Sequence, residues 1–363
     1  MPLKTTAGDH GQQVKGRGAT INIEGRFEVW NREASDDGWF QDPGDEPARV
    51  KTVISIEYAK SVISRHNSPD VGFAQSINPY RGCAHGCIWC FARPTHAYLG
   101  LSPGLDFETR LFAKVNAAQK LREELGKPGY KCEPLTIGVN TDAYQPIERQ
   151  YKITRSILEV ASETIHPVSL ITKSALIERD LDLLAPMAKK NLVSVTLSIT
   201  TLDHEISRRM EPRTSAPARR LEAVRRLTEA GIPVNVNVAP VIPFLTDSEL
   251  EPILEAAAKA GAISAGYILI RLPWEVRPIF KEWLEKHFPL KAEHVMSRIR
   301  DMRDGRENDP NFGSRMVGKG TLAELLSQRF RKAVTRFGLD RDHRELDCSL
   351  FVPPSLNGQK TLF

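Results

Sequence analysis

Six short apolar segments recur between residues 73 and 271, and amphipathic segments of helical periodicity separate them. Residues 193–199, which are almost continuously apolar, are typical of a parallel strand that is buried on both faces. The pattern predicts an α/β fold, namely a partial (β/α)6 barrel of TIM type, with a doubly wound open sheet as the alternative. The predicted strands are 73–77, 135–139, 168–172, 193–200, 234–241 and 266–271, and the predicted helices are 109–125, 147–162, 179–190, 217–230 and 247–259.

Local signals mark several helix ends. Thr246 and Glu249 are spaced as a capping box, in which both side chains bond to backbone groups at a helix start. Gly231 and Gly261 stand where two of the helices should end. In a barrel of this kind, reactive groups gather at the carboxyl ends of the strands.

The chain of 363 residues is long enough for one large domain or two ordinary ones. Outside the barrel, which we place at residues 71–275, four segments are expected. They are a disordered tail (1–16), an N-terminal extension with strand-like alternation at 19–30 and 49–59 around an acidic loop (17–70), a basic helical region (276–345) and a C-terminal tail (346–363).

The charge balance is mildly basic, with 50 Lys and Arg against 45 Asp and Glu, a formal net charge of +5. This permits a polyanionic partner without requiring one. No apolar run approaches the roughly 18 residues of a membrane span, and the first residues lack the apolar core of a signal peptide. We therefore expect a cytoplasmic monomer that does not associate with membranes.

Three cysteines, Cys83, Cys87 and Cys90, follow the first predicted strand with the spacing C-x3-C-x2-C. Thiolates at such spacing select an iron–sulfur cluster or zinc. A cluster held by three cysteines leaves one iron open to an exogenous ligand, whereas zinc would need a fourth protein ligand such as His85 or His96. The spacing favours the cluster and keeps zinc as the alternative.

Polar residues follow the next strands. Asn140 and Thr141 come after the second strand, Lys173 after the third, and Ser198 ends the apolar part of the fourth. A lysine that closes an apolar strand can neutralise a buried carboxylate, although each of these residues can equally cap a strand or helix. Arg208, Glu211 and Arg213 form a charged group after the fourth strand, and no hydrolase triad or phosphate-binding glycine loop is present.

Several longer motifs between about Ser76 and Pro273 resemble the radical S-adenosylmethionine (SAM) proteins related to spore photoproduct lyase. They are NPYRGCAHGCIWCFARP, GVNTDAYQPIE, ITKSALIERDLDLL, SITTLD…MEPRT…RLEAVRRLTEAG and PVIPFLTDSE. The resemblance implies that the three cysteines bind a [4Fe–4S] cluster whose fourth iron is chelated by SAM. It also implies reductive cleavage of SAM to methionine and a 5′-deoxyadenosyl radical, with an electron donor such as flavodoxin or ferredoxin.

The resemblance further implies roles for individual residues. Trp89 would approach the adenine of SAM, and Lys173 and Ser198 would contact its carboxylate. Asn140 or Thr141 would contact the polar end of SAM. Glu211 would contact SAM or the substrate.

One departure from that family concerns the hydrogen-atom donor. In spore photoproduct lyase a cysteine ends the second strand, but here Val139 and Asn140 stand in that place, and Cys132 precedes the strand. The photoproduct-splitting reaction is therefore in doubt. The substrate stays unassigned, with DNA, for example a damaged base, favoured over RNA, protein and small molecules.

The chain ends as Q-x-x-L-F, through Gln359, Leu362 and Phe363, which resembles the motif that docks bacterial proteins on the sliding clamp. The alternative is that the terminal pair packs on the protein itself. Arg329, Lys332 and Arg336 lie one helical turn apart and predict either a phosphate-facing stripe or a solvated face. Two competing hypotheses are a zinc-stabilised nucleic-acid-binding protein and an interaction protein recruited through this tail, both without catalysis.

Overall fold

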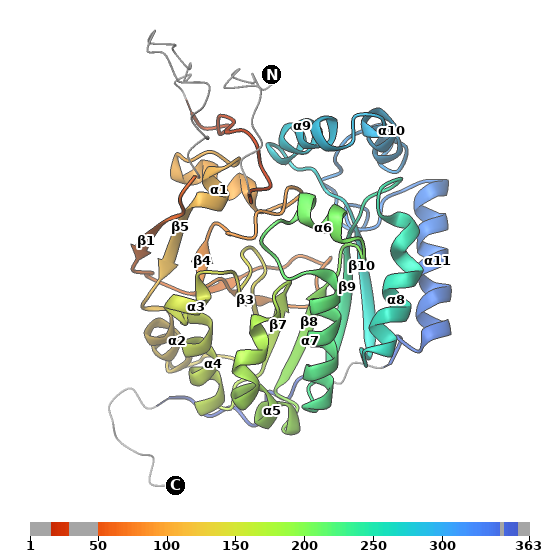
Figure 1. The fold of residues 1–363 in the computed structure, drawn as a ribbon. Helices are drawn as coiled ribbons and strands as arrows, with labels where there is room; N and C mark the ends of the chain where they lie inside the picture. Colours follow the sequence, from red (N-terminus) through yellow and green to blue (C-terminus); the bar gives the residue numbers. More distant parts are fainter. Residues whose placement is uncertain (1–15, 29–49, 342–344, 355–363) are drawn as a thin grey trace, which may run out of the picture.

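The computed structural model describes residues 16–28, 50–341 and 345–354 (Figure 1). Most of the expected N-terminal tail, the acidic loop and the clamp motif of Gln359, Leu362 and Phe363 lie outside these residues.

The main sheet has the strand order β10-β9-β8-β7-β6-β3-β2. The six strands from β3 to β10 pair in parallel, and β2 adds antiparallel to β3 at one edge. The parallel strands follow one another in chain order, whereas a doubly wound sheet reverses its order at a switch point. The partial (β/α)6 barrel is thus confirmed, and the doubly wound alternative is wrong. The strands are β2 (Ile63–Arg65), β3 (Gln75–Ile77), β6 (Leu135–Ile137), β7 (Val168–Thr172), β8 (Val193–Ser198), β9 (Val234–Val241) and β10 (Ser264–Leu269).

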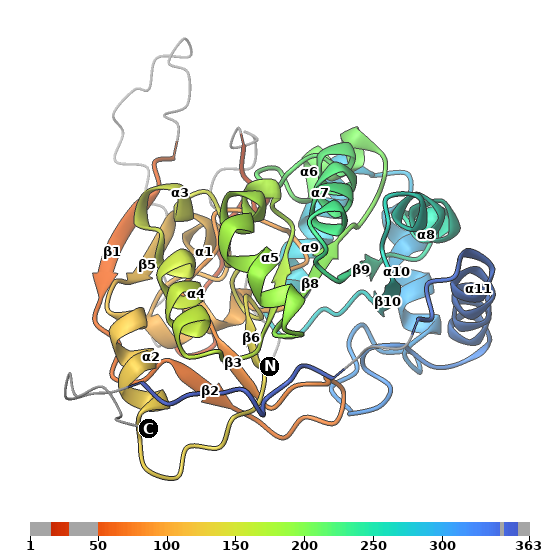
Figure 2. The same ribbon diagram turned by 90° about the horizontal axis from the view of Figure 1, so that it is seen from below.

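Helices cover the outer face of this sheet (Figures 1 and 2). In β7, β8 and β9, fully buried positions alternate with less buried ones, and Val193, Val195 and Leu197 of β8 are examples of the fully buried side chains. Burying one such side chain contributes about 1.5–3 kcal/mol, so the strand pattern in the sequence reports the core directly. The covering helices are α2 (Ala117–Leu125), α4 (Ile153–Glu163), α5 (Leu181–Lys189), α7 (Pro217–Glu229) and α8 (Leu250–Lys259).

A second sheet of three strands stands beside the barrel, in the order β1-β5-β4. It contains β1 (Val53–Glu57), which pairs in parallel with β5 (Arg110–Lys114), and β4 (Tyr80–Arg81). The predicted helix 109–125 is therefore wrong in its first part, because β5 buries Leu111 and Ala113 on alternate positions and pairs with a strand of the N-terminal extension.

The strand-like alternation at 19–30 does not produce a strand in the described residues 19–28. Instead, the backbone amides of Gly18 and Ala19 donate hydrogen bonds to the carboxylate of Glu108, at 3.0 and 2.8 Å. A buried carboxylate thus binds the amides at the start of this segment.

Two helix predictions need correction. The predicted helix 147–162 is divided into α3 (Glu148–Tyr151) and α4 because Lys152 adopts a left-handed conformation with φ 50°. The predicted capping box is wrong. The Glu249 carboxylate accepts hydrogen bonds from the Thr201 hydroxyl and from the Leu202 amide, the latter at 2.6 Å, and not from the backbone at the start of its own helix. Gly231 and Gly261 do end helices, at φ 78° and 99°.

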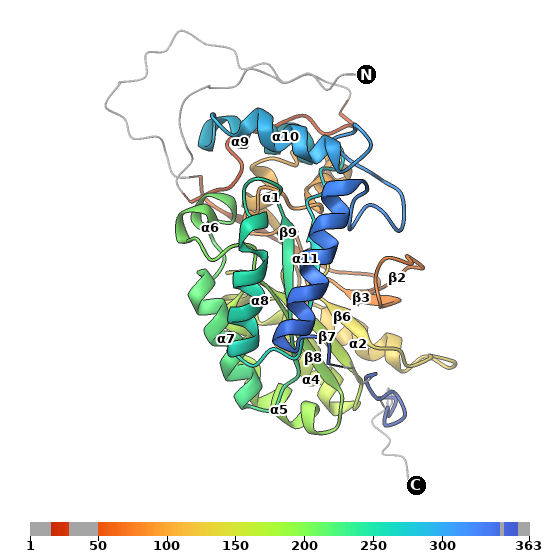
Figure 3. The ribbon, with the colours of Figure 1, turned by 90° about the vertical axis from the view of Figure 1, so that its right-hand side faces the viewer.

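The helical C-terminal region is confirmed (Figure 3). Helix α11 (Thr321–Phe337) packs beside α8, where Arg329 forms a bidentate pair with Glu251. The predicted phosphate-facing stripe is therefore wrong for Arg329, because this arginine is already paired with a carboxylate. The other elements are α1 (Asp106–Thr109), α6 (His204–Met210), α9 (Val276–His287), α10 (Ala292–Asp301) and the 3-10 turns η1 (Arg93–Leu99), η2 (Ala175–Asp180) and η3 (Asp247–Glu249).

No helix in the described ranges is both long and apolar enough to cross a membrane.

Residues 345–352 cross the amino ends of the strands (Figure 2). The amide of Asp347 donates to the Asn191 carbonyl at 3.0 Å, and that of Val352 donates to the Thr164 carbonyl at 2.9 Å. Both acceptors precede a strand, β8 and β7 respectively. Cys348 interacts here with Cys132, so both of these cysteines lie at the edge opposite the carboxyl ends.

His166 is fully buried beneath this crossing segment. Its Nδ1 donates to the Pro167 carbonyl at 2.9 Å, and its Nε2 accepts from the Tyr130 hydroxyl at 2.9 Å, while the ring of Phe351 packs edge-on at 5.1 Å. These partners suit the neutral ring, and burial lowers the pKa of His166 to about 4.

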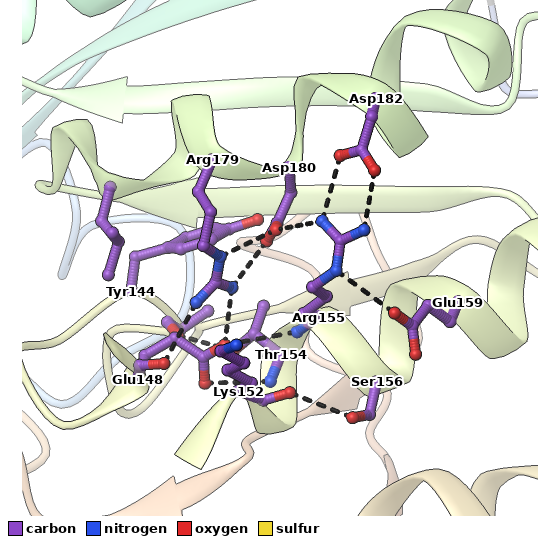
Figure 4. Close-up of polar contacts among 12 residues, drawn as sticks. Tyr144, Glu148, Lys152, Thr154, Arg155, Ser156, Glu159, Arg179, Asp180 and Asp182 are labelled. Carbon is purple, nitrogen blue, oxygen red and sulfur yellow. Dashed lines mark hydrogen bonds and ion pairs between the residues drawn. The ribbon is translucent and has the colours of Figure 1, made fainter. Parts of the chain in front are cut away.

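Beneath α3 and α4 a buried ion-pair network joins the two sheets (Figure 4). The carboxylate of Glu148 is fully buried and accepts from the Tyr80 hydroxyl of β4 and from Arg179. Arg179 also binds Asp180, which in turn binds Arg155. The carboxylates of Glu148 and Asp180 are fully buried, whereas the two arginines are partly exposed, so each buried carboxylate depends on these arginines for its countercharge.

We predict that Glu148→Ala lowers the free energy of unfolding by about 2–3 kcal/mol, since the buried Tyr80 hydroxyl loses its acceptor and Arg179 keeps only Asp180 as its carboxylate partner. Glu159, at the exposed end of the same network, provides the control: Glu159→Ala should cost less than about 1 kcal/mol. Urea unfolding followed by circular dichroism measures both. Equal losses would contradict the buried network.

We predict that the free energy of unfolding falls as the pH is lowered from 6.5 towards 4, by about 3 kcal/mol from His166 alone. The folded state disfavours the protonated ring, so the contribution is complete above pH 6.5 and is lost on acidification. His166→Gln should flatten this part of the curve, whereas His204→Gln, at an exposed histidine, should not. Urea titrations at several pH values distinguish the two variants.

Candidate active site

The loop of Cys83, Cys87 and Cys90 follows β3 and β4, at the carboxyl edge of the sheet. Cys83 and Cys87 are buried and Cys90 is half-buried. Gly86, between the first two, has φ 67°, and a Cβ there would lie 2.5 Å from a Glu108 carboxylate oxygen. Only glycine satisfies both the backbone conformation and this close approach.

Arg93 lies beneath the loop and is fully buried. Its guanidinium donates to the carbonyls of Cys87 and Gly86, at 2.9 and 3.2 Å, and forms an ion pair with the buried Glu108. These bonds hold the loop backbone that carries the thiols. The sequence pattern did not predict a role for Arg93 or Glu108, and its one signal was that Arg93 stands three residues after the last cysteine of the motif.

Asp142 links the cysteine loop to two strand ends. Its carboxylate accepts from the Thr172 hydroxyl and the Lys173 amide, at 2.6 and 2.8 Å, and pairs with His85 Nδ1 at 3.3 Å. Burial by itself lowers the pKa of His85, but Asp142 and Cys83 oppose this, so that the pKa rises to about 9. His85 is thus a hydrogen-bonding residue of the loop.

Lys173 directs its ammonium toward the same loop, with Nζ 4.8 Å from the centre of the Trp89 ring. Burial lowers the pKa of Lys173, but Cys87, Glu211 and Asp142 outweigh it and the net shift is upward. Within the described ranges, Lys173 Nζ makes no hydrogen bond or ion pair, and the buried indole Nε1 of Trp89 has no partner either. Two donors at this edge therefore lack an acceptor.

Glu211 is buried next to this pair. Its carboxylate binds Arg220, which also donates to the Ser198 carbonyl at 3.0 Å, and it accepts from Thr200 at 3.1 Å. The expected grouping of Glu211 with Arg208 and Arg213 is wrong. Arg208 pairs with Glu205 on the exposed side of α6, and Arg213 donates from its side chain to Thr52 at 3.4 Å.

Asn140 and Thr141 lie on the same edge but are positioned differently. Asn78 Oδ1 accepts from both backbone amides, at 2.8 and 3.3 Å, and the buried Thr141 hydroxyl donates to the Tyr80 carbonyl at 3.2 Å. Asn140 is exposed. The structure therefore brings the cysteine loop, Trp89, Lys173, Ser198 and Glu211 together, with Asn140 and Thr141 on the adjacent strand end.

A zinc site finds no support in this arrangement. His85 is bonded to Asp142, and the His96 ring is bonded to the Arg110 carbonyl at 3.0 Å. Over the residues that the structure describes, no three His, Cys, Asp or Glu side chains converge to hold a single metal ion. A [4Fe–4S] cluster binds each cysteine to a different iron, so three thiols of one loop that do not converge on one point fit it better.

We predict that Arg93→Met reduces the iron and sulfide content after anaerobic reconstitution to less than about half and lowers the free energy of unfolding by about 3–5 kcal/mol. The loop carbonyls lose their donor, and Glu108 is left buried without its cation. Arg110→Met, at an exposed arginine nearby, is the matched control and should load normally. Full loading of Arg93→Met would show that the loop holds its shape unaided.

Comparison with known proteins agrees with this geometry. The family model of the radical SAM superfamily matches residues 77–257. An uncharacterised protein of Mycobacterium tuberculosis is 36% identical over 281 residues, which cover 77% of this chain and 78% of the relative. Another, from Methanocaldococcus jannaschii, is 26% identical over 246 residues, covering 68% of this chain and 87% of the relative.

Solved structures of spore photoproduct lyase share the fold. The complex with dinucleoside spore photoproduct has a TM-score of 0.57 at 16% identity, covering 84% of this chain and 87% of the lyase. A mutant with bound AdoMet and the same dinucleoside has a TM-score of 0.56 at 17% identity, with the same coverage. At such identity the likeness concerns the fold alone. The matched family model and the 36% identical relative show that the chain belongs to the radical SAM superfamily and is a radical SAM enzyme.

Proposed function

We propose that this enzyme binds a [4Fe–4S] cluster through Cys83, Cys87 and Cys90 and uses it to cleave SAM reductively. When bound, the reduced cluster and SAM supply a 5′-deoxyadenosyl radical, which removes a hydrogen atom from the substrate. A reductant is needed, and we propose a small electron carrier of the flavodoxin or ferredoxin class. Supporting the proposal are three thiols, two buried and one half-buried, on one loop at the carboxyl edge of the barrel, where this fold places its reactive groups.

The observation that carries the proposal is the ammonium of Lys173, which lacks a partner within the described residues. It lies over Trp89 and close to Cys87, so a carboxylate bound there would also be next to the thiols. We assign Lys173 to the carboxylate of SAM and Trp89 to its adenine. A charge-assisted hydrogen bond in such a shielded place is among the strong interactions that a protein makes with a ligand.

The remaining residues have supporting roles in this proposal. Glu211, whose charge Arg220 already balances, offers an acceptor to SAM or substrate, and Ser198 contributes to the carboxylate site. The exposed side chain of Asn140 would contact the polar end of SAM. The Thr141 hydroxyl, bound to the Tyr80 carbonyl, orients the strand end that carries Asn140.

For the substrate we propose DNA, for example a damaged base. The fold likeness to a protein whose complex contains a dinucleoside photoproduct supports this class. The photoproduct-splitting step itself is not carried over. Val139 and Asn140 replace the cysteine of that family, and the interaction of Cys348 with Cys132 keeps both thiols at the opposite edge of the sheet. Docking on a sliding clamp through Gln359, Leu362 and Phe363 stays a prediction.

Anaerobic reconstitution tests the proposal. Iron and sulfide should each approach about four per chain, and dithionite should release 5′-deoxyadenosine from SAM. Cys87→Ala should lose cluster and cleavage together. A colourless protein with one tightly bound zinc would contradict the proposal.

Lys173→Met tests the SAM site separately. It should keep its iron but bind SAM about 10- to 100-fold more weakly, because one charge-assisted hydrogen bond is lost. Lys190→Met, at an exposed lysine, is the charge-matched control. Equilibrium dialysis with labelled SAM measures the affinity, and unchanged binding by Lys173→Met would remove this assignment.

A further inference from the structure

Arg271 follows β10, the last strand of the barrel, at the same edge as the cysteine loop. Among the described residues, its buried Nε has no hydrogen-bond partner, and its Nη1 makes a long hydrogen bond to the sulfur of Met316, at 3.8 Å. No carboxylate in the described ranges lies within ion-pair distance of this guanidinium. A half-buried cation whose donors are this poorly satisfied is suited to an anion brought by a ligand.

Two further arginines surround Arg271 and add to its positive charge. Arg303 is buried, and its guanidinium donates to the carbonyls of Ile270 and Arg315, the latter at 3.2 Å. Arg315 itself binds Asp70, in the loop between β2 and β3. Through Arg303 and Arg315, the segment after the last strand of the barrel is linked to the loop before the first strand. Of these three arginines, Arg271 is the one without an oxygen acceptor among the described residues.

Exposed aromatic rings accompany the arginines along this rim. Phe91, which directly follows the last cysteine of the motif, lies 5.7 Å from the Arg271 guanidinium, and Phe312 lies 4.4 Å from that of Arg315. Three residues beyond Arg271, Trp274 is 61% exposed and contacts Arg26 at 4.4 Å. Rings with this exposure have faces available for stacking.

Building on the proposed function, we propose that Arg271 binds a backbone phosphate of a single-stranded nucleic acid substrate while Phe91 and Phe312 stack on its bases. A phosphate presents the oxygen pair that a guanidinium fork recognises. Every base offers a planar face to an exposed ring, and stacked rings interleaved with cations are the arrangement by which proteins bind single strands. Because Phe91 directly follows Cys90, a base stacked on its ring would lie next to the cysteine loop.

The main competing ligand of the same charge is an acidic peptide. Its carboxylates suit Arg271 equally well, but its side chains leave the exposed rings without a planar partner. The repeated pairing of arginine with an exposed ring therefore favours the nucleic acid. Loss of an exposed ring should weaken the binding of a nucleic acid but not that of an acidic peptide. Phe312 lies outside the cysteine loop and is therefore a second position at which to test this difference.

The experiment measures fluorescence anisotropy of a labelled oligothymidylate of about twelve nucleotides with the reconstituted full-length enzyme and SAM. Arg271→Met should weaken binding about tenfold or more and reduce the slope of log K against log salt by about 0.7. Phe312→Leu should weaken it about fivefold or more without changing that slope. Arg271→Lys, which keeps the charge but not the fork, should fall between wild type and Arg271→Met.

Arg225→Met, at an exposed arginine of α7 that pairs with Glu222 and Glu229, controls for the loss of one positive charge and should bind as wild type does. The inference is overturned if Arg271→Met binds the oligonucleotide as tightly as Arg225→Met. It is also overturned if an oligoglutamate of equal length binds as well as the oligonucleotide. Release of 5′-deoxyadenosine by the wild type, measured on the same preparation without oligonucleotide, tests the proposed function independently of this binding.

Discussion

One carboxylate, that of Asp142, connects the parts of the molecule on which the site depends. It belongs to the loop after β6, it binds the hydroxyl and amide of consecutive residues at the end of β7, and it pairs with His85 inside the cysteine loop. Burial disfavours a charged carboxylate, but these donors more than offset that cost, and they hold the pKa of Asp142 below its usual range. This buried carboxylate therefore helps to fix the position of the cysteine loop relative to Lys173.

The same principle recurs around the carboxyl edge. Arg93 with Glu108 supports the cysteine loop from below, and Arg220 with Glu211 braces the end of β8. Buried pairs of this kind add little net stability compared with apolar residues, but breaking one leaves a charge without a partner. Their effect is to fix geometry, since each guanidinium also binds backbone carbonyls of a particular loop. Lys173, which lacks such a partner in the described residues, stands out against this background of satisfied charges.

The two edges of the barrel are chemically different. Thiols, ammonium and indole meet at the carboxyl edge, whereas the crossing segment 345–352 covers the amino edge and carries Cys348 to Cys132. A thiol at the amino edge is separated from the carboxyl edge by the length of the strands. Cys348 and Cys132 therefore lie away from the edge that carries the three cysteines of the motif.

The sequence by itself determined the barrel and its thiol loop, because both are encoded locally. Alternating apolar residues predicted β7 and β9 to the residue, and the spacing of the cysteines favoured an iron–sulfur cluster while leaving zinc as an alternative. Only the tertiary structure decided the rest. Residues 110–114 became a strand because β1 pairs with them, and Glu249 left its helix to bind Thr201, 48 residues away. Periodicity records which face of a segment is buried, but it carries no information about which distant charge or strand will meet that face.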